Sequence, residues 1–195
     1  MRYNPEHKQR THEKVLHEAA QAIRLQGPDR ISIAELMTNA GLTHGGFYAH
    51  FKSKDELVAE AVDWMFAERR AAFAKYLESK APADALATYI DMYLSPRHRD
   101  HREQGCPVAA LGGDLVRLPE LARERFDAGI RRLVSNLANL LQQCGHESPE
   151  PLAHSVFCEM LGALILSRNL LDRPLSGQIL DTARNSLRTR LNLTD

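Results

Sequence analysis

The chain has 195 residues, of which 44% are hydrophobic and 26% are charged, and its 25 basic and 25 acidic side chains give a formal net charge of zero. This length suits one or two domains with a buried core, and the composition is that of an ordinary globular protein. No apolar stretch is long enough to cross a bilayer, and the polar first 14 residues exclude a secretory signal. We therefore expect a cytoplasmic protein.

The charge is distributed unevenly along the chain. Residues 1–54 contain eight Lys or Arg and five Asp or Glu, which gives +3, so the remainder carries −3. A basic first part joined to an acidic body favours a DNA-reading segment attached to a second domain.

The first predicted helix spans residues 6–26. Its inward stripe recurs at helical spacing and consists of Val15, Ala19, Ala22 and Ile23. Gly27 is placed to cap its C-terminus, and Pro28 prevents the helix from continuing.

Residues 31–58 predict two short helices joined by a tight turn, followed by the start of a third helix. Gly41 can adopt the positive φ that ends the first helix, and Thr43 can cap the second. Capping boxes mark the first helix at Ser32 and the third at Ser53. Apolar residues between these boxes form one seam: Leu36, Ala40, Leu42, Phe47 and Phe51. The pattern predicts a helix-turn-helix whose second helix faces DNA.

The rest of the chain predicts further helices and no β-strand. A long uninterrupted helix covers 54–80, and the others cover about 82–94, 107–117, 120–144, 152–172 and 175–192. Residues 97–105 predict a polar loop too charged to be buried. The last two helices are the predicted homodimer interface, because 152–172 is apolar around much of its circumference. The alternative is that this helix is part of the core. The fold class is all-α, with about nine helices.

The run AGLTHGGFYAHFKSKDEL, within residues 31–58, resembles the TetR family of transcriptional regulators. The resemblance extends more loosely to the whole chain. It implies a helix-turn-helix DNA-binding domain at residues 1–53 and a helical effector-binding and dimerisation domain at 54–195. It also implies a homodimer that binds double-stranded operator DNA, represses nearby genes and is released by a small-molecule effector.

The resemblance assigns DNA-binding residues position by position. Family members touch the phosphate backbone at positions that correspond here to Thr43, Tyr48, His50 and Lys54. Side chains approach base edges at positions that correspond to His44, Gly45 and Gly46. Ser32, which begins the first helix of the unit, completes the predicted DNA-binding set.

The residue pattern independently favours this surface. Phe47 and Phe51 are one helical turn apart and face inward, which leaves the two glycines and Ala49 facing outward. Such small residues let the helix backbone approach a major groove closely, and His44 becomes the best candidate to contact a base. Lys54 stands in the first turn of the long helix, where a lysine opposes the helix dipole, so we expect its partner to be a phosphate.

Aromatic and sulfur-containing side chains in the C-terminal part could line an effector cavity, although such residues more often form ordinary core. The predicted lining residues are Tyr89, Met92, Tyr93, Phe126, Phe157 and Met160. Because few charged side chains are among them, we expect an apolar or aromatic effector rather than an anionic one.

Cys106 stands at the predicted start of helix 107–117, directly before Pro107. Three arginines precede it closely: Arg97, Arg99 and Arg102. A helix N-terminus and nearby cations favour a thiolate, so Cys106 is a candidate thiol sensor that alters the dimer when it is modified. The alternative is a small apolar residue packed beneath Pro107.

The other cysteine patterns predict no metal, no cofactor and no disulfide framework. Cys106, Cys144 and Cys158 are odd in number and widely spaced, and the last two lie in apolar stripes that indicate core packing. His98, His101 and Cys106 match no strong zinc spacing.

Two other classes of function are open at this stage. A small helical enzyme would use Cys106 as a nucleophile with His98 or His101 as its base, but no nucleophile–base–orienter motif is visible. A helical protein-interaction module is the third interpretation. Neither accounts for residues 31–58, so we expect a DNA-binding regulator rather than an enzyme.

Overall fold

The computed structural model describes residues 5–193, apart from the side chains of Pro5, Tyr76 and Leu115. Within this range the chain is entirely helical, with nine α-helices and three short 3-10 helices. The α-helices are α1 (Pro5–Gln26), α2 (Ile33–Asn39), α3 (Lys54–Leu77), α4 (Pro82–Tyr93), α5 (Pro96–Asp100), α6 (Pro107–Leu111), α7 (Glu120–Gln143), α8 (Pro149–Asn169) and α9 (Arg173–Arg190). The 3-10 helices are η1 (His44–Ala49), η2 (Arg102–Gln104) and η3 (Leu115–Arg117). The predicted all-α class is confirmed.

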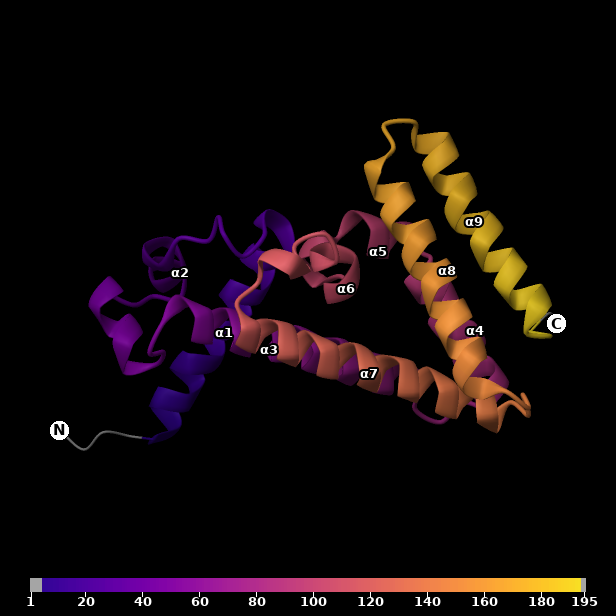
Figure 1. Ribbon diagram of the computed structural model, residues 1–195, viewed down its shortest axis with the longest axis horizontal. Coiled ribbons are helices and arrows are strands. Elements are labelled where there is room, and N and C mark those ends of the chain that lie inside the picture. The colour runs from indigo at the N-terminus through magenta and orange to yellow at the C-terminus, as the bar shows by residue number, and fades with distance from the viewer. Residues whose placement is uncertain (1–4, 194–195) are drawn as a thin grey trace.

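The helices form two groups connected by a pair of long helices (Figure 1). The first group contains α1, α2 and η1, and the second contains α4, α8 and α9. Between them α3 and α7 lie side by side, and α3 also packs against α1. Helix α3 therefore contacts both groups, α1 in the first and α4 in the second.

The first helix is held by the stripe that its sequence predicts. Val15, Ala19 and Ile23 have no exposed surface, which is the inward face of an amphipathic helix. Gly27 adopts a φ of +83° and donates its N–H to the carbonyl of Ile23 at 2.9 Å, so the helix ends where glycine can take the left-handed conformation.

The contact between α3 and α7 depends on one glycine. A Cβ atom placed on Gly129 of α7 would lie 2.3 Å from the ring of Phe66 on α3, so only a glycine lets this ring pack against the helix. Phe66 also meets Phe126 edge to face at 5.4 Å. The single tryptophan, Trp64, lies half-buried on α3, and its indole nitrogen is buried with no hydrogen-bond partner among the described residues.

The segment from 96 to 105 differs from the predicted polar loop. It forms α5 and η2, and His98 within it is buried. Ser95 caps α5 by accepting the N–H of His98 at 3.1 Å, and Arg99 pairs with Asp100 at 2.9 Å. The segment is therefore helical and partly paired, while its residues 97, 100, 101, 102 and 104 remain exposed as the charged sequence predicts.

Two other helix boundaries also differ from the prediction. The predicted helix 107–117 is interrupted, because α6 ends at Leu111 and Gly112 and Gly113 separate it from η3. The last long pair begins earlier than expected, since α8 starts at Pro149, a residue predicted to lie in a linker. Proline is readily accommodated in the first turn of a helix, so its presence does not mark a loop there.

The α8–α9 pair leaves several large apolar side chains exposed. Leu166 on α8 is 59% exposed, Leu175 at the start of α9 is 42% exposed, and Leu171 between them is 99% exposed. Most of the other apolar residues of α8 are buried or half-buried, and the helix packs against α7 and α9. None of the helices in residues 5–193 is sufficiently long and apolar to span a membrane.

Candidate nucleic-acid interface and internal cavity

The turn between α2 and η1 is built from the predicted cap and glycine. Ser32 accepts the N–H of Glu35 at 3.3 Å and so begins α2. Gly41 has a φ of +76°, and the N–H of Leu42 donates to the carbonyl of Met37 at 2.8 Å. This is the backbone arrangement of a glycine-terminated helix, and it fixes the direction in which the chain enters η1.

The second helix of the unit is shorter and tighter than predicted. His44–Ala49 forms a 3-10 helix in which the N–H of Gly46 donates to the carbonyl of Thr43 at 3.0 Å. Gly45 and Gly46 lower the helix propensity of this six-residue segment, and 3-10 geometry is common in such short pieces. Thr43 occupies the N-terminal cap position, but its side chain makes no capping hydrogen bond, contrary to the prediction.

The inward and outward faces of this unit are those that the sequence predicts. Phe47 and Phe51 are each 1% exposed, and their rings stack 5.5 Å apart. His44 and Gly45 are exposed, and Tyr48 is 71% exposed while its ring rests edge-on against Phe47. The phenol oxygen and the imidazole are therefore presented to solvent from a rigid apolar base.

Lys54 ties the start of α3 to the chain before α2. Its ammonium donates to the backbone carbonyls of Asp29 at 3.0 Å and Ile31 at 3.2 Å. An ammonium group has three hydrogens to donate, so one hydrogen is left for a ligand oxygen. At the same point Ser53 accepts the N–H of Glu56 at 3.1 Å, which is the predicted cap of α3.

His50 lies between the apolar base and the surface. It is half-buried, its Nδ1 has no hydrogen-bond partner among the described residues, and its ring lies 6.0 Å from that of His12. Burial, together with the charges of His12 and Lys8, lowers the pKa of His50 below its ordinary value. At neutral pH His50 is thus suited to hydrogen bonding rather than to charge pairing.

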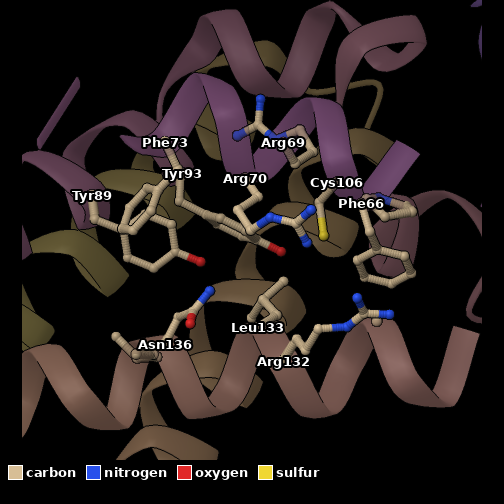
Figure 2. Close-up of a pocket in the computed structure, with 13 residues that line it drawn as sticks. Phe66, Arg69, Arg70, Phe73, Tyr89, Tyr93, Cys106, Arg132, Leu133 and Asn136 are labelled. Atoms are coloured by element: carbon tan, nitrogen blue, oxygen red, sulfur yellow. The ribbon is translucent and has the colours of Figure 1, made fainter. Parts of the chain in front are cut away.

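A cavity opens between α3 and α7, and its α3 lining begins at Phe66 (Figure 2). Its empty space is about 670 Å³, part of which is open to solvent. Aromatic and apolar side chains form its walls, and Arg70, Arg132 and Asn136 are exposed at its rim. The full lining consists of Phe66, Arg69, Arg70, Phe73, Tyr89, Tyr93, Cys106, Pro107, Gly129, Arg132, Leu133, Asn136 and Leu137.

Of the six predicted effector residues, Tyr89 and Tyr93 line this cavity. The other four are outside its lining: Met92, Phe126, Phe157 and Met160. Phe157 lies behind Tyr93, with 6.3 Å between ring centroids, and Met160 is fully buried in the core. These residues were chosen for their apolar character, and apolar character alone does not separate a wall from the core behind it.

The lining residues that the sequence did not single out come from α3 and α7. Phe66, Arg69, Arg70 and Phe73 recur at helical spacing along one face of α3. Gly129, Arg132, Leu133 and Asn136 do the same on α7. A signal was present in these two stripes of mixed arginine and apolar residues, but nothing local indicates that they face each other.

Cys106 lies at the inner end of the cavity, 2% exposed, and its backbone is held by His98. The N–H of Cys106 donates to Nε2 of His98 at 2.9 Å, so Nε2 carries no proton and Nδ1 donates to the carbonyl of Tyr93 at 2.8 Å. Burial, with the nearby Arg69 and Arg168, lowers the pKa of His98 to about 3, although the Tyr93 carbonyl opposes this. The imidazole is neutral and serves as a scaffold.

Two cations that interact with Cys106 are distant from it in sequence. Arg24 and Arg168 interact electrostatically with the Cys106 thiol. Arg99 instead donates to Ser176 at 3.0 Å and to Asp100. Arg168 donates to the carbonyl of His98 at 2.8 Å and thereby fixes the loop on which the thiol sits.

Arg24 connects the first helix to the Cys106 segment. It is 2% exposed, and its guanidinium donates to the carboxylate of Glu68 at 3.1 Å and to the carbonyl of Met65 at 3.3 Å, both on α3. The same guanidinium donates to the carbonyl of Glu103 in η2 at 3.1 Å. One buried side chain therefore joins α1, α3 and the segment that leads to Cys106.

Comparisons with known proteins agree with this architecture. Residues 15–61 match the family model described as bacterial regulatory proteins, tetR family. The HTH-type transcriptional repressor Rv3405c of Mycobacterium tuberculosis is 26% identical over 144 residues, which are 72% of this chain and 74% of that protein. The HTH-type transcriptional repressor NemR of Escherichia coli is 25% identical over 168 residues, 82% of each chain.

Solved structures share the fold over nearly the whole chain. The reduced form of Escherichia coli NemR superimposes with a TM-score of 0.80 at 21% identity, over 92% of this chain and 97% of that one. A TetR transcriptional regulator from Chloroflexus aurantiacus superimposes with a TM-score of 0.81 at 26% identity, over 96% of both chains.

The helix-turn-helix with its exposed tip, placed before a larger helical body, defines a DNA-binding transcriptional regulator. The sequence relatives Rv3405c and NemR are both named as HTH-type transcriptional repressors. The family-model match over residues 15–61, the curated relatives and the solved structures together support the TetR family, as the run at residues 31–58 predicts.

Proposed function

We propose that this regulator is a repressor that binds operator DNA as a homodimer and is released by a small effector or by modification of Cys106. The observation that carries the proposal is the course of α3, which begins beside η1 at Lys54 and further along supplies four residues of the cavity lining. The relatives Rv3405c and NemR are both named as transcriptional repressors, which favours repression over activation.

In this proposal residues 1–53 contact DNA and residues 54–195 bind the effector and the second subunit. Residues 1–4 and 194–195 lie outside the described part of the chain. His44 and the backbone at Gly45 and Gly46 approach base edges, because His44 and Gly45 are exposed, Gly46 is half-buried and the two glycines carry no side chain. The predicted phosphate contacts come from Thr43, Tyr48, His50 and Lys54, with Ser32 supporting them at the start of α2.

The homodimer forms through α8 and α9 in this proposal. Leu166, Leu171 and Leu175 give this pair an exposed apolar surface that a second copy would cover. Regulators of this family are typically dimers, which agrees with the surface. Sedimentation of the wild-type chain and of Leu166→Glu tests the assignment, with dimer expected for the first and monomer for the second. An unchanged dimer in Leu166→Glu would place the interface elsewhere.

Release follows from the position of the cavity between α3 and α7. A ligand that fits better when these helices move apart shifts the population toward that arrangement. Since α3 continues to η1, such a shift changes the spacing of the two DNA-contacting tips in a dimer, whereas half-site spacing on DNA is fixed. Effector binding and operator binding then oppose each other, and by linkage each weakens the other equally.

Modification of Cys106 acts at the same place. The thiol is 2% exposed and lines the cavity, so a reagent reaches it through the cavity and the adduct occupies that space. A catalytic role has less support, because both ring nitrogens of His98 are engaged by backbone groups and neither faces the thiol as a base. We infer regulation rather than catalysis, in the cytoplasm where DNA is accessible.

The test is fluorescence anisotropy with DNA fragments selected from the source genome by binding to the protein. We expect specific retention that is lost after alkylation by iodoacetamide, which forms an S–C bond at the thiol and releases iodide and a proton. Cys106→Ser should retain DNA binding and resist release, whereas Cys158→Ser, at an exposed cysteine, should behave as wild type. Absence of any selected sequence would contradict the proposed function, and release of Cys106→Ser would contradict the thiol sensor alone.

A further inference from the structure

We propose that the cavity between α3 and α7 binds a small aromatic carboxylate, with Arg70 and Arg132 holding the carboxylate and Tyr93 donating to one of its oxygens. This inference rests on the proposed effector role of the cavity and names the chemical class of the effector. It replaces the expectation of an uncharged ligand, which was based on six residues of which four do not line the cavity.

The first observation is an excess of positive charge. The lining contains Arg69, Arg70 and Arg132 and no aspartate or glutamate. Arg69 donates to the carbonyl of Gln104 at 3.4 Å and Arg132 to the carbonyl of Ala128 at 3.3 Å, so neither is neutralised by these contacts. Among the described residues Arg70 has no ion pair or hydrogen bond. An anion at the cavity mouth would be held by charge-assisted hydrogen bonds to guanidinium groups.

The second observation is a buried donor without a strong acceptor. Tyr93 is 2% exposed, and no acceptor meets its hydroxyl in hydrogen-bonding geometry among the described residues, although the neighbouring Cys106 thiol, a weak acceptor, interacts with it. Burial, with the neighbouring Cys106 and Tyr89, raises the pKa of Tyr93 well above its ordinary value, so the hydroxyl keeps its proton. Figure 2 shows the phenol oxygens of Tyr89 and Tyr93 directed into the pocket, on the side where Arg70 enters it. A ligand oxygen there satisfies a group that otherwise has no strong acceptor.

The third observation is the apolar character of the walls between these polar groups. Phe66 and Phe73 on α3 and Leu133 on α7 supply apolar walls, and Figure 2 shows Phe66 at one end of the pocket. Aromatic and aliphatic walls of this kind favour a flat apolar ring between them.

The experiment measures binding of benzoate and of benzamide to the full-length protein by titration calorimetry. The two probes share ring and size and differ in charge. We expect saturable benzoate binding that is at least about tenfold tighter than benzamide binding, since hydrogen bonds to charged groups contribute more than neutral ones. Arg70→Gln combined with Arg132→Gln should abolish this preference. Arg131→Gln, at an exposed residue of α7 paired with Asp127 outside the lining, is the matched control and should retain it.

Tyr93→Phe provides a second readout that does not depend on charge. It should weaken benzoate binding several-fold while leaving the circular dichroism spectrum unchanged, because only a hydroxyl without a strong acceptor is removed. Equal affinity for benzamide, retention of the preference in the double arginine variant, or no saturable benzoate binding would overturn the inference. Operator binding is measured separately by anisotropy on the same preparation. A protein that binds DNA and not benzoate contradicts the ligand class alone, and one that fails to bind any DNA contradicts the proposed function.

Discussion

The guanidinium of Arg24, in the last turn of α1, donates a hydrogen bond of 3.1 Å to the backbone carbonyl of Glu103, three residues before Cys106. Arg24 also holds Glu68 and the carbonyl of Met65 on α3. In the proposed regulator a change at Cys106 therefore reaches the first helix through one buried side chain, in addition to the direct path along α3.

Replacement of Arg24 by methionine should both destabilise the fold and weaken this coupling. Glu68 loses its buried partner but is 31% exposed at its side chain and also contacts His17, so we expect a cost of about 1–3 kcal/mol. Urea unfolding measures this cost, and Arg10→Met, at an exposed residue of the same helix, should change it little. Arg24→Met should also retain DNA binding while losing most of the response to cavity modification. A full response in this variant would show that α3 alone transmits the signal.

Lys54→Ala should weaken operator binding across sequences and lower the slope of log K against log salt by about 1, as expected for one lost phosphate contact. Tyr48→Phe should weaken binding without a change in slope, because a phenol carries no charge. Lys75→Ala, in the last turn of α3, is the distant control. Since Lys54 also holds the carbonyls of Asp29 and Ile31, its variant must be compared at matched folded fraction. An unaltered affinity and slope would remove Lys54 from the interface.

Gly45→Ala separates close approach to DNA from folding. A Cβ atom at Gly45 has no neighbour within 4 Å, so thermal stability should be unchanged while operator affinity falls. Gly41→Ala, by contrast, should lower the free energy of unfolding by about 1 kcal/mol, because the φ of +76° at this position disfavours a side chain. Equal operator affinity in folded Gly45→Ala would mean that η1 does not lie against base edges.

The environment of His98 predicts a loss of stability on mild acidification. Its pKa in the folded protein is about 3, whereas an unfolded histidine binds a proton below about 6.5, so the unfolded state takes up more protons between these values. The contribution is fully present above pH 6.5 and is lost as the pH falls toward 3, by up to about 1.4 kcal/mol per pH unit. Chemical unfolding between pH 7.5 and 5 should show this decline.

His98→Gln tests whether His98 causes this decline. The variant should be less stable at neutral pH, and its free energy of unfolding should depend less on pH. The other groups facing His98 are Arg69, Arg168 and the Cys106 segment, none of which is acidic. Asp100, whose pKa is lowered to about 2 chiefly by its hydrogen bond from Arg99, acts in a different window, because its stabilisation is lost only below about pH 4. An equal decline above pH 5 in His98→Gln would point to His50 instead, whose pKa is also lowered.

The helix-turn-helix could be predicted from sequence because its determinants are local. Ser32, Gly41 and Phe47 lie within 16 residues and specify a cap, a turn and an apolar anchor without reference to the rest of the chain. The 3-10 form of η1 was missed because two adjacent glycines leave its geometry to be set by packing at Phe47 and Phe51.

The cavity could not be predicted in the same way, because it depends on which helix faces which. Arg70 and Arg132 lie 62 residues apart, and only the packing of Phe66 on Gly129 brings their helices together. The burial of His98 could not be predicted for the same reason, since the carbonyl and N–H groups that bond to its ring belong to Tyr93 and Cys106, outside its own helix. The sequence shows the helical periodicity of each stripe, but it does not show which stripes pack against each other.

Trp64 is placed where its fluorescence can report on the state of α3. It is the single tryptophan of the chain and lies on α3, two residues before the Phe66 that lines the cavity and ten residues after Lys54. Its indole N–H is buried without a hydrogen-bond partner in the described structure, so water or a new acceptor reaching it would change the emission of the unmodified protein. The helix that joins the two ends of the molecule thus contains its own fluorescent reporter, and the order of ligand arrival and DNA departure can be followed in real time without a label.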